Sequence, residues 1–269
     1  MRRRDWLWMA GGALAGAARA ETATERGKRV VDDCLQALGG DAFLKMQDRV
    51  ERGRAYQFYR ERISGLAVAR IYTRYLTRPE PPVPGQIQVR ERENFGKEEE
   101  YGGVLITEDG AWDLSWRGAR PRDDQWCANY KDSLLRNTLY ILRQRLGEPG
   151  LTFYSQGGDM YENRPVEIVD ISDADGRSVT VYFSRLDKLP VRQVFKRRNP
   201  EYKDFDTETT VWAKYRDVGG GVKWPQSTLR ERNGEKIYEM YADAVEINRN
   251  LTDNLFTLPA NLKMLPKGK

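Results

Sequence analysis

Residues 207–247 read TETTVWAKYRDVGGGVKWPQSTLRERNGEKIYEMYADAVEI, and their order predicts an antiparallel β meander. Three segments rich in β-branched and aromatic residues follow one another: Thr207–Tyr215, Val222–Arg232 and Glu235–Ile247. Three glycines separate the first two segments, and Asn233-Gly234 separates the last two. An Asn-Gly pair adopts the positive φ angles of a type I′ turn at low cost, so it favours a tight hairpin between two strands.

The same pattern of short β segments separated by turn residues continues over most of the chain on either side of this stretch. Asp109-Gly110 and Asp175-Gly176 give two more hairpin signals. The pattern predicts about eleven or twelve strands in one domain, and up-and-down connectivity makes such a large twisted sheet curl. The remaining predicted strands are Arg49–Arg60, Leu66–Thr77, Gln86–Phe95, Gly103–Thr107, Ala111–Ser115, Leu151–Gln156, Pro165–Ile171, Ser178–Ser184 and Val191–Lys196.

Two helices interrupt the β pattern. Apolar residues at helical spacing predict one helix over Val30–Leu38, which Gly39-Gly40 ends, and a second over Gln125–Leu146. The last predicted strand carries apolar residues on both faces, with Tyr241 on one side and Met240 on the other. In a sheet with one solvent-exposed face, apolar and polar residues would alternate more regularly along the strand. Burial of both faces fits a curled sheet that encloses something, and it also fits an ordinary sandwich core.

The first twenty residues have the pattern of an export signal. Three arginines precede the apolar segment Trp6–Ala18, and Ala18-Arg19-Ala20 supplies a small-x-small cleavage motif before Glu21. The arginine pair before Trp6 is typical of a twin-arginine signal, although an ordinary secretory signal also fits. We therefore expect a signal peptide over residues 1–20, cleavage between Ala20 and Glu21, and a mature domain over residues 21–269 without a transmembrane segment.

The charge balance argues against nucleic acid as a partner. The chain has 45 basic and 40 acidic residues. Removal of residues 1–20 takes away four arginines and one aspartate, which leaves 41 basic against 39 acidic residues. Phosphate-backbone binding needs a concentrated basic patch. Charges here alternate closely, as in Arg90-Glu91-Arg92-Glu93, which is typical of a solvated face.

The sequence contains no recognisable catalytic centre. It has no histidine, which excludes Ser-His-Asp and Cys-His nucleophile systems and the common histidine-containing zinc sites. No glycine motif for a nucleophile elbow, a P-loop or a dinucleotide occurs. Glu98-Glu99-Glu100 and Asp204-Phe205-Asp206 could bind Ca²⁺ or act as acid and base, but solvated turns are the better interpretation. We predict no enzyme activity, no metal and no cofactor.

The sequence contains two cysteines, which raises the question of a disulfide. Cys34 and Cys127 could form one disulfide in an oxidising compartment, and the sequence leaves this open.

Aromatic residues cluster where the sheet meets the second helix, as in many apolar ligand pockets. They could equally fill a permanent core under that helix. The candidate ligand-binding residues are Trp112, Trp116, Trp126, Tyr130, Leu139 and Tyr140.

An ordered set of short motifs in the carboxy-terminal half resembles one family. The motifs are Asp187–Arg192, Tyr215–Val218, Gly221–Pro225, Asn233-Gly234, Val245–Asn248 and Leu255-Phe256, preceded far upstream by Leu38-Gly39-Gly40. Together they resemble exported members of the LolA/LolB outer-membrane lipoprotein-sorting superfamily. The resemblance implies an open half-barrel of about eleven antiparallel strands, with helices over its concave face and an apolar cavity for acyl chains.

These features together predict a non-catalytic periplasmic protein. The first hypothesis is a carrier that binds a lipid, a lipoprotein acyl group or another apolar molecule. The alternative is a structural or regulatory module that uses the same fold to bind another cell-envelope protein. In both cases the expected mainly-β domain acts by binding alone.

Overall fold

A computed structural model describes residues 21–96, 102–199, 201–260 and 262–267. The predicted signal peptide with Ala20, and the acidic run Glu98–Glu100, lie outside these residues. Within them, thirteen strands form one antiparallel sheet. The strands are β1 (Asp48–Tyr59), β2 (Arg62–Tyr75), β3 (Val89–Phe95), β4 (Gly103–Thr107), β5 (Gly110–Ser115), β6 (Gly118–Pro121), β7 (Thr152–Tyr161), β8 (Arg164–Ser172), β9 (Ser178–Ser184), β10 (Pro190–Arg198), β11 (Phe205–Asp217), β12 (Lys223–Arg232) and β13 (Glu235–Ile247).

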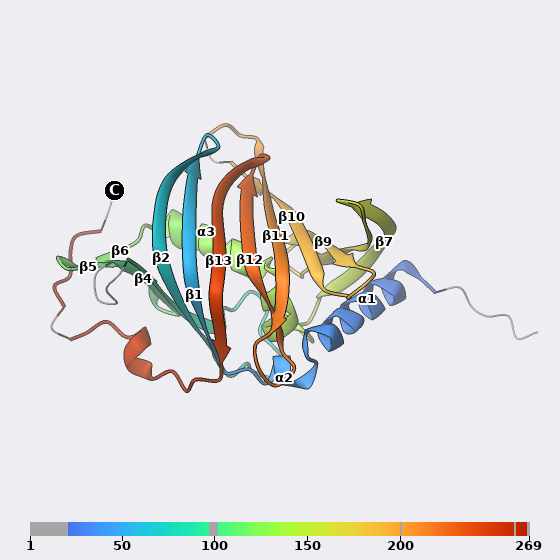
Figure 1. Cartoon of the computed structure of the whole chain (residues 1–269), viewed down its shortest axis with the longest axis horizontal. Helices are drawn as coiled ribbons and strands as arrows, with labels where there is room; N and C mark the ends of the chain where they lie inside the picture. The colour runs from blue at the N-terminus through green and yellow to red at the C-terminus, as the bar shows by residue number, and fades with distance from the viewer. Residues whose placement is uncertain (1–20, 97–101, 200, 261, 268–269) are drawn as a thin grey trace, which may run out of the picture.

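The sheet is two meanders joined by their first and last strands. Its order is β6-β5-β4-β3-β2-β1-β13-β12-β11-β10-β9-β8-β7, so β1 pairs with β13 near the middle. The sheet curls strongly without closing (Figure 1), and β6 and β7 are its two edges. The predicted single curled sheet is confirmed. All twelve predicted strands are present, and the strand that the pattern missed is the four-residue β6.

All three hairpin signals lie between paired antiparallel strands, but only Asn233-Gly234 forms the turn at the predicted position. Asp175-Gly176 belongs to a longer connection, residues 173–177, between β8 and β9, and Gly176 alone of the two has a positive φ angle. Asn233 and Gly234 connect β12 to β13 with φ angles of 53° and 83°, as a type I′ turn requires. The turn between β4 and β5 is formed by Glu108 and Asp109, while Gly110 is already the first residue of β5. The meander predicted for residues 207–247 therefore has the expected strands and turns.

Helix α1 (Ala23–Leu38) packs one apolar face against the sheet. Thr22 caps it by accepting a hydrogen bond from the backbone N–H of Glu25, in a reciprocal capping box. The helix approaches β7 so closely that a Cβ atom on Gly27 would lie 2.7 Å from the Phe153 carbonyl oxygen. Its buried residues are Gly27, Val30, Val31, Cys34 and Leu38.

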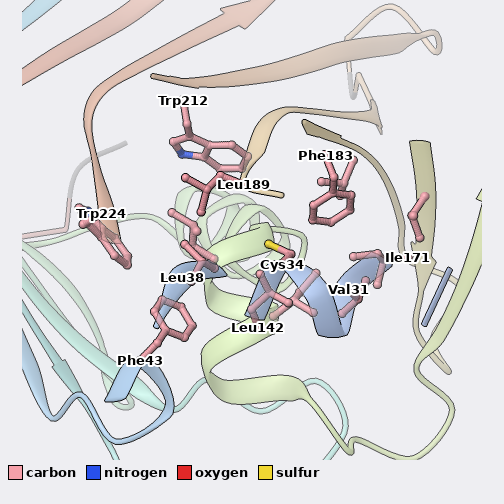
Figure 2. Packing of buried hydrophobic residues seen from close by; sticks show 14 of the residues in the cluster. Val31, Cys34, Leu38, Phe43, Leu142, Ile171, Phe183, Leu189, Trp212 and Trp224 are labelled. Carbon is pink, nitrogen blue, oxygen red and sulfur yellow. The ribbon is translucent and has the colours of Figure 1, made fainter. Parts of the chain in front are cut away.

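The main core lies between α1, the short helix α2 (Asp41–Leu44), the helical residues 139–142 and strands β8 to β13. Phe43 of α2 stacks on Trp224 of β12 with 6.4 Å between ring centroids. Figure 2 shows how side chains from these elements converge on Cys34 and Leu38 of α1. Residues of this core include Val31, Leu142, Ile171, Phe183, Leu189 and Trp212.

The second predicted helix is present but broken. It consists of α3 (Asp124–Leu135), the single turn α4 (Thr138–Tyr140) and the π-helical turn η1 (Ile141–Arg145). The break occurs at Asn137, whose side chain accepts a hydrogen bond from the Tyr140 N–H and starts a new helix. α3 crosses behind the central strands (Figure 1), on the concave face of the sheet. In the described part of the chain, no helix is both long and apolar enough to span a membrane.

Candidate ligand-binding face

Strand register determines which side chains face α3. Val104 of β4 packs against Trp126 of α3, so its face is the concave one. Val104 pairs with Glu93 of β3, Glu93 pairs with Ile71 of β2, and Ile71 pairs with Glu51 of β1. Paired residues point to the same face of a sheet. Glu51 and Glu93 therefore point inward, although the sequence pattern around Glu93 suggested a solvated surface.

A second row of inward-facing residues lies beside the first. Arg49 of β1, Thr73 of β2 and Glu91 of β3 are paired in register. The Arg49 guanidinium is buried, 2.7 Å from the Glu51 carboxylate, and its carbon lies 4.0 Å from the ring centroid of Trp224. Three carboxylates and one arginine thus occupy neighbouring positions on the concave face of β1 to β3. The interpretation of Arg90–Glu93 as a solvated face is wrong for its two glutamates.

Helix α3 reaches this row through one tyrosine. The Tyr130 hydroxyl donates a hydrogen bond of 2.7 Å to Glu91. Trp126, one turn earlier, stacks on Tyr130 with 5.5 Å between ring centroids. Both rings rest on Val104 and Ile106 of β4 and on Ala111 of β5. Of the twelve residues of α3, all of them described, Leu135 alone is buried. The helix therefore covers the concave face without being packed tightly against it.

Burial changes how the inward carboxyls titrate. Desolvation raises the pKa of Glu91, although the Tyr130 hydroxyl and the Arg49 charge oppose this. Desolvation and the nearby Glu91 carboxylate raise the pKa of Glu93 to about 8. No described residue forms a hydrogen bond or ion pair with Glu93. At neutral pH the Glu93 carboxyl is mostly protonated, so it can donate a hydrogen bond as well as accept one.

The free energy of unfolding should depend on pH through Glu93. A folded-state pKa of about 8 against 4.5 in the unfolded chain gives a stability that falls as pH rises from about 4.5 to 8. Glu93→Gln, which mimics the protonated form, should raise the free energy of unfolding by about 2 kcal/mol at pH 9 and change it little at pH 4.5. One pKa unit corresponds to about 1.4 kcal/mol, so the whole pKa difference between the folded and unfolded states would give a larger gain. Water access to the carboxyl and relaxation of Glu91 reduce that gain.

Urea unfolding at the two pH values measures this effect. The matched control is Glu235→Gln, because Glu235 is an exposed residue of β13. The control should not change the pH dependence. An equal gain from Glu93→Gln at pH 4.5 and pH 9 would contradict the assignment of the raised pKa to this residue.

The other end of the concave face is apolar. Ala55 of β1 and Ala69 of β2 are small and buried, and Met240 of β13 packs against them. Phe95 and Tyr238 contact this cluster from the side and stay partly exposed. We call Ala55, Ala69, Ile71, Phe95, Tyr238 and Met240 the apolar strip. Along β1 and β2 the concave face thus changes from charged side chains to apolar ones.

The six aromatic and aliphatic candidates from the sequence do not form one site. Trp126 and Tyr130 lie together on α3 at the concave face. Trp112 pairs with Leu105 and packs on the opposite face, against Phe256 of the 3₁₀ turn η2 (Asp253–Phe256). Trp116 is 71% exposed. Leu139 belongs to the main core, and the buried Tyr140 accepts a hydrogen bond from the Gln88 N–H. The ligand-contact roles proposed for these residues stay predictions.

The remaining candidates from the sequence can now be placed. Cys34 and Cys127 are free thiols: Cys34 lies in the main core and Cys127 packs against the cluster under α3. Asp206, the second residue of β11, accepts hydrogen bonds from the side chains of Asn199 and Asn233. Among the described residues, no group of three or more Cys, Asp or Glu side chains could hold a metal ion.

The sequence signal for the inward carboxyls was present but ambiguous. Glu91 and Glu93 lie two positions apart, the spacing of one strand face, and so do Arg49 and Glu51. Arg90 and Arg92 show the same spacing. Only the pairing of β3 with β2 and β4 determines which of the two sets faces α3.

Comparison with known proteins gives structural neighbours alone. No family model matches the chain, and no curated protein matches it. A DUF1329 family protein from Desulfovibrio piger superposes with a TM-score of 0.58 at 12% identity, over 86% of this chain and 97% of that one. A putative outer membrane lipoprotein-sorting protein domain from Vibrio parahaemolyticus gives 0.55 at 10% identity, over 87% and 97%.

A third neighbour belongs to the family that the sequence motifs resemble. A LolA superfamily protein from Nitrosomonas europaea superposes with a TM-score of 0.50 at 9% identity, over 86% of this chain and 97% of that one. Identities this low establish the fold without establishing the ligand. The thirteen-stranded open sheet, with α3 across its concave face, is a LolA-like fold.

Proposed function

We propose that this protein binds an amphipathic, lipid-like molecule on its concave face, beneath α3, and acts as a carrier in the cell envelope. The observation that carries the proposal is the loose cover: α3 crosses the face while Leu135 alone of its residues is buried. A helix that closed a permanent core would bury an apolar face along its length, as α1 does. A helix held by a few long side chains can move to admit a ligand.

The chemistry of the face fits a molecule with two unlike ends. The apolar strip accommodates hydrocarbon, at about 0.8 kcal/mol for each methylene removed from water. Glu91 and Glu93 offer hydrogen-bond acceptors and, in protonated Glu93, a donor to a polar head group. Binding of this kind needs no catalytic group. The export signal predicted over residues 1–20 and the lipoprotein-sorting neighbour support a periplasmic location.

The first experiment is native mass spectrometry with lipid extraction, on mature protein purified from the periplasm. We expect a co-purifying lipid or acylated peptide at near-stoichiometric occupancy. Emptied protein should then take up a fluorescent fatty acid. A protein that arrives empty and also fails to take up the fatty acid would contradict the carrier function.

A pair of variants on β2 tests the location. Ala67 pairs with Ala55 and faces the concave side, while the next residue, Val68, faces outward and is 45% exposed. Ala67→Trp should place an indole over the apolar strip and weaken fatty-acid binding at least about tenfold. Val68→Trp, the matched control, should leave binding unchanged. Equal losses in the two variants, with similar melting temperatures, would mean that the ligand does not occupy this face.

A second candidate function rests on exposed apolar residues at the end of the β1–β2 hairpin. Tyr59 is 65% exposed, and Ile63 and Leu66 are each 62% exposed. Large apolar residues exposed together mark protein-interaction sites. We propose as the alternative that another envelope protein docks on this hairpin. A protein that co-purifies with wild-type chains holding no lipid, and is lost from the Ile63→Ser and Leu66→Ser variants, would favour the alternative.

A further inference from the structure

The outer face of the sheet, opposite α3, has a hollow of about 280 Å³. Arg54 of β1 pairs with Tyr241 of β13 in this hollow. Arg54 is next to the inward-facing Ala55 in β1, so the Arg54–Tyr241 pair points outward. The hollow is open to solvent and spans the neighbouring strands β1, β13, β12 and β11. It is lined by Arg54, Lys214, Arg216, Gln226, Tyr241, Ala242 and Asp243.

Two irregularities of the sheet meet at this hollow. Arg52 pairs with Ala244 and Gly53 with Ala242, so Asp243 of β13 bulges out without a partner on β1. Lys214 lies within β11 with a φ angle of 57°, a left-handed conformation that costs free energy in a residue other than glycine. Bulges and such strained residues redirect side chains and occur preferentially at binding sites.

The redirected side chains concentrate positive charge. The Lys214 ammonium lies 5.1 Å from the ring centroid of Tyr241. Neither Lys214 nor Arg216 forms an ion pair with a described residue, and Arg54 has one partner, Asp243, at 3.7 Å. The Tyr241 hydroxyl donates its hydrogen bond to Glu239, so the cations are the groups that remain to face a ligand. Three cations thus face one lining carboxylate around a hollow of small-molecule size.

We propose that this hollow is an anion site that binds the phosphate group of a phosphorylated small molecule or lipid head group. Arginine presents a planar fork of N–H donors that matches phosphate oxygens, and lysine adds a compact point charge. The buried Gln226, 7% exposed, closes one wall, so the bound group would be partly shielded from solvent. The site lies on the face opposite the apolar strip, and it stands whether or not the concave face binds a lipid.

Calorimetric titration of the mature protein with inorganic phosphate and with glycerol phosphate tests the site, together with sedimentation with phosphatidylglycerol or phosphatidylcholine vesicles. We expect saturable binding that weakens as salt is added, because exposed charges are screened. Saturation by the soluble phosphates identifies a small phosphorylated ligand. Binding to phosphatidylglycerol vesicles without any response to soluble phosphates identifies a lipid head group.

Variants with matched charge separate the site from general basicity. Arg54→Gln combined with Arg216→Gln should weaken binding at least tenfold. The control, Arg60→Gln combined with Arg62→Gln, removes two exposed arginines from the tip of the β1–β2 hairpin and should change binding less than twofold. Lys214→Gly relieves the left-handed strain, so it should weaken binding while the melting temperature stays the same or rises. Equal losses in the two double variants, or no saturable binding of any probe, would overturn the proposal.

Discussion

Replacement of Arg145 by alanine should lower the free energy of unfolding by about 3–5 kcal/mol, one of the two largest effects expected for this chain. The Arg145 side chain of η1 is 3% exposed. It pairs with Glu148 at 2.6 Å and with Asp173 at 2.8 Å, both nearly inaccessible to solvent. Loss of the guanidinium leaves two buried carboxylates without their cation, and an uncompensated buried charge is costly.

The titration of Asp173 gives this prediction a pH dependence. Burial by itself would raise the pKa of Asp173, but hydrogen bonds from Arg145 and Arg177 hold it below its ordinary value. A lowered folded-state pKa contributes stability above the unfolded pKa, and this contribution is lost as pH falls through the folded one. The cost of Arg145→Ala should therefore be largest at neutral pH and shrink in acid, where Asp173 is protonated in both proteins.

Urea unfolding of wild type and variant at pH 7 and pH 3 measures both effects. Arg52→Ala is the control, because Arg52 forms a half-exposed surface pair with Glu246 at 3.1 Å. A pair of that kind contributes no more than about 1 kcal/mol. The triple variant Arg145→Met, Glu148→Gln, Asp173→Asn should recover much of the loss. A cost that is the same at both pH values, and is not recovered by the triple variant, would point to packing as the origin.

The same arginine connects stability to the proposed movement of α3. Arg145 also donates a hydrogen bond to the carbonyl oxygen of Leu135, the last residue of α3. Arg145→Ala should therefore speed hydrogen exchange along α3 more than along α1. This local readout is independent of the global free energy of unfolding.

The second large effect is expected at Trp224. Trp224→Ala should lower the free energy of unfolding by about 3–5 kcal/mol, because a large aromatic side chain leaves a cavity in a packed core. Trp224 is 6% exposed, stacks on Phe43 and lies under the Arg49 guanidinium. Its loss removes a cation–π contact from Arg49, the residue that neutralises Glu51 on the concave face.

A matched tryptophan distinguishes this effect from loss of any indole. Trp116 is 71% exposed, so Trp116→Ala should change the free energy of unfolding by no more than about 0.5 kcal/mol. Trp224→Phe, which keeps an aromatic ring beside Phe43, should cost less than Trp224→Ala. Chemical denaturation of the three variants gives the ranking. Similar costs for Trp116→Ala and Trp224→Ala would contradict the burial on which the prediction rests.

Local signals were sufficient for most of the elements. Hairpin turns are determined by two residues, so Asn233-Gly234 could be identified without knowledge of the rest of the chain. The break in the second helix had a weaker local signal in Asn137, a good helix N-cap inside an otherwise continuous apolar stripe. The missed strand β6 has four residues and no alternation long enough to recognise.

The candidate site could be predicted far less well, because it depends on contacts between distant residues. Trp112 and Trp126 looked like neighbours in the sequence, but the pleat of β5 directs Trp112 to the face opposite α3. Glu91 and Glu93 looked like surface residues, but the register with β2 and β4 directs them inward. A shift of one residue in that register would exchange the two faces.

The amino-acid sequence by itself therefore determined the strand segments, the Asn233-Gly234 turn, the end of α1 at Gly39 and the antiparallel meander, because these depend on residues close together in the chain. The start of α1 at Ala23, seven residues before the predicted Val30, was missed. The tertiary structure alone decided that β1 pairs with β13, which charged residues of β3 face inward, and that Lys214 and Asp243 line the same hollow. Those features depend on pairing between strands up to about two hundred residues apart. The free energy of such pairing is set by both faces of the sheet together, and no local pattern reports it.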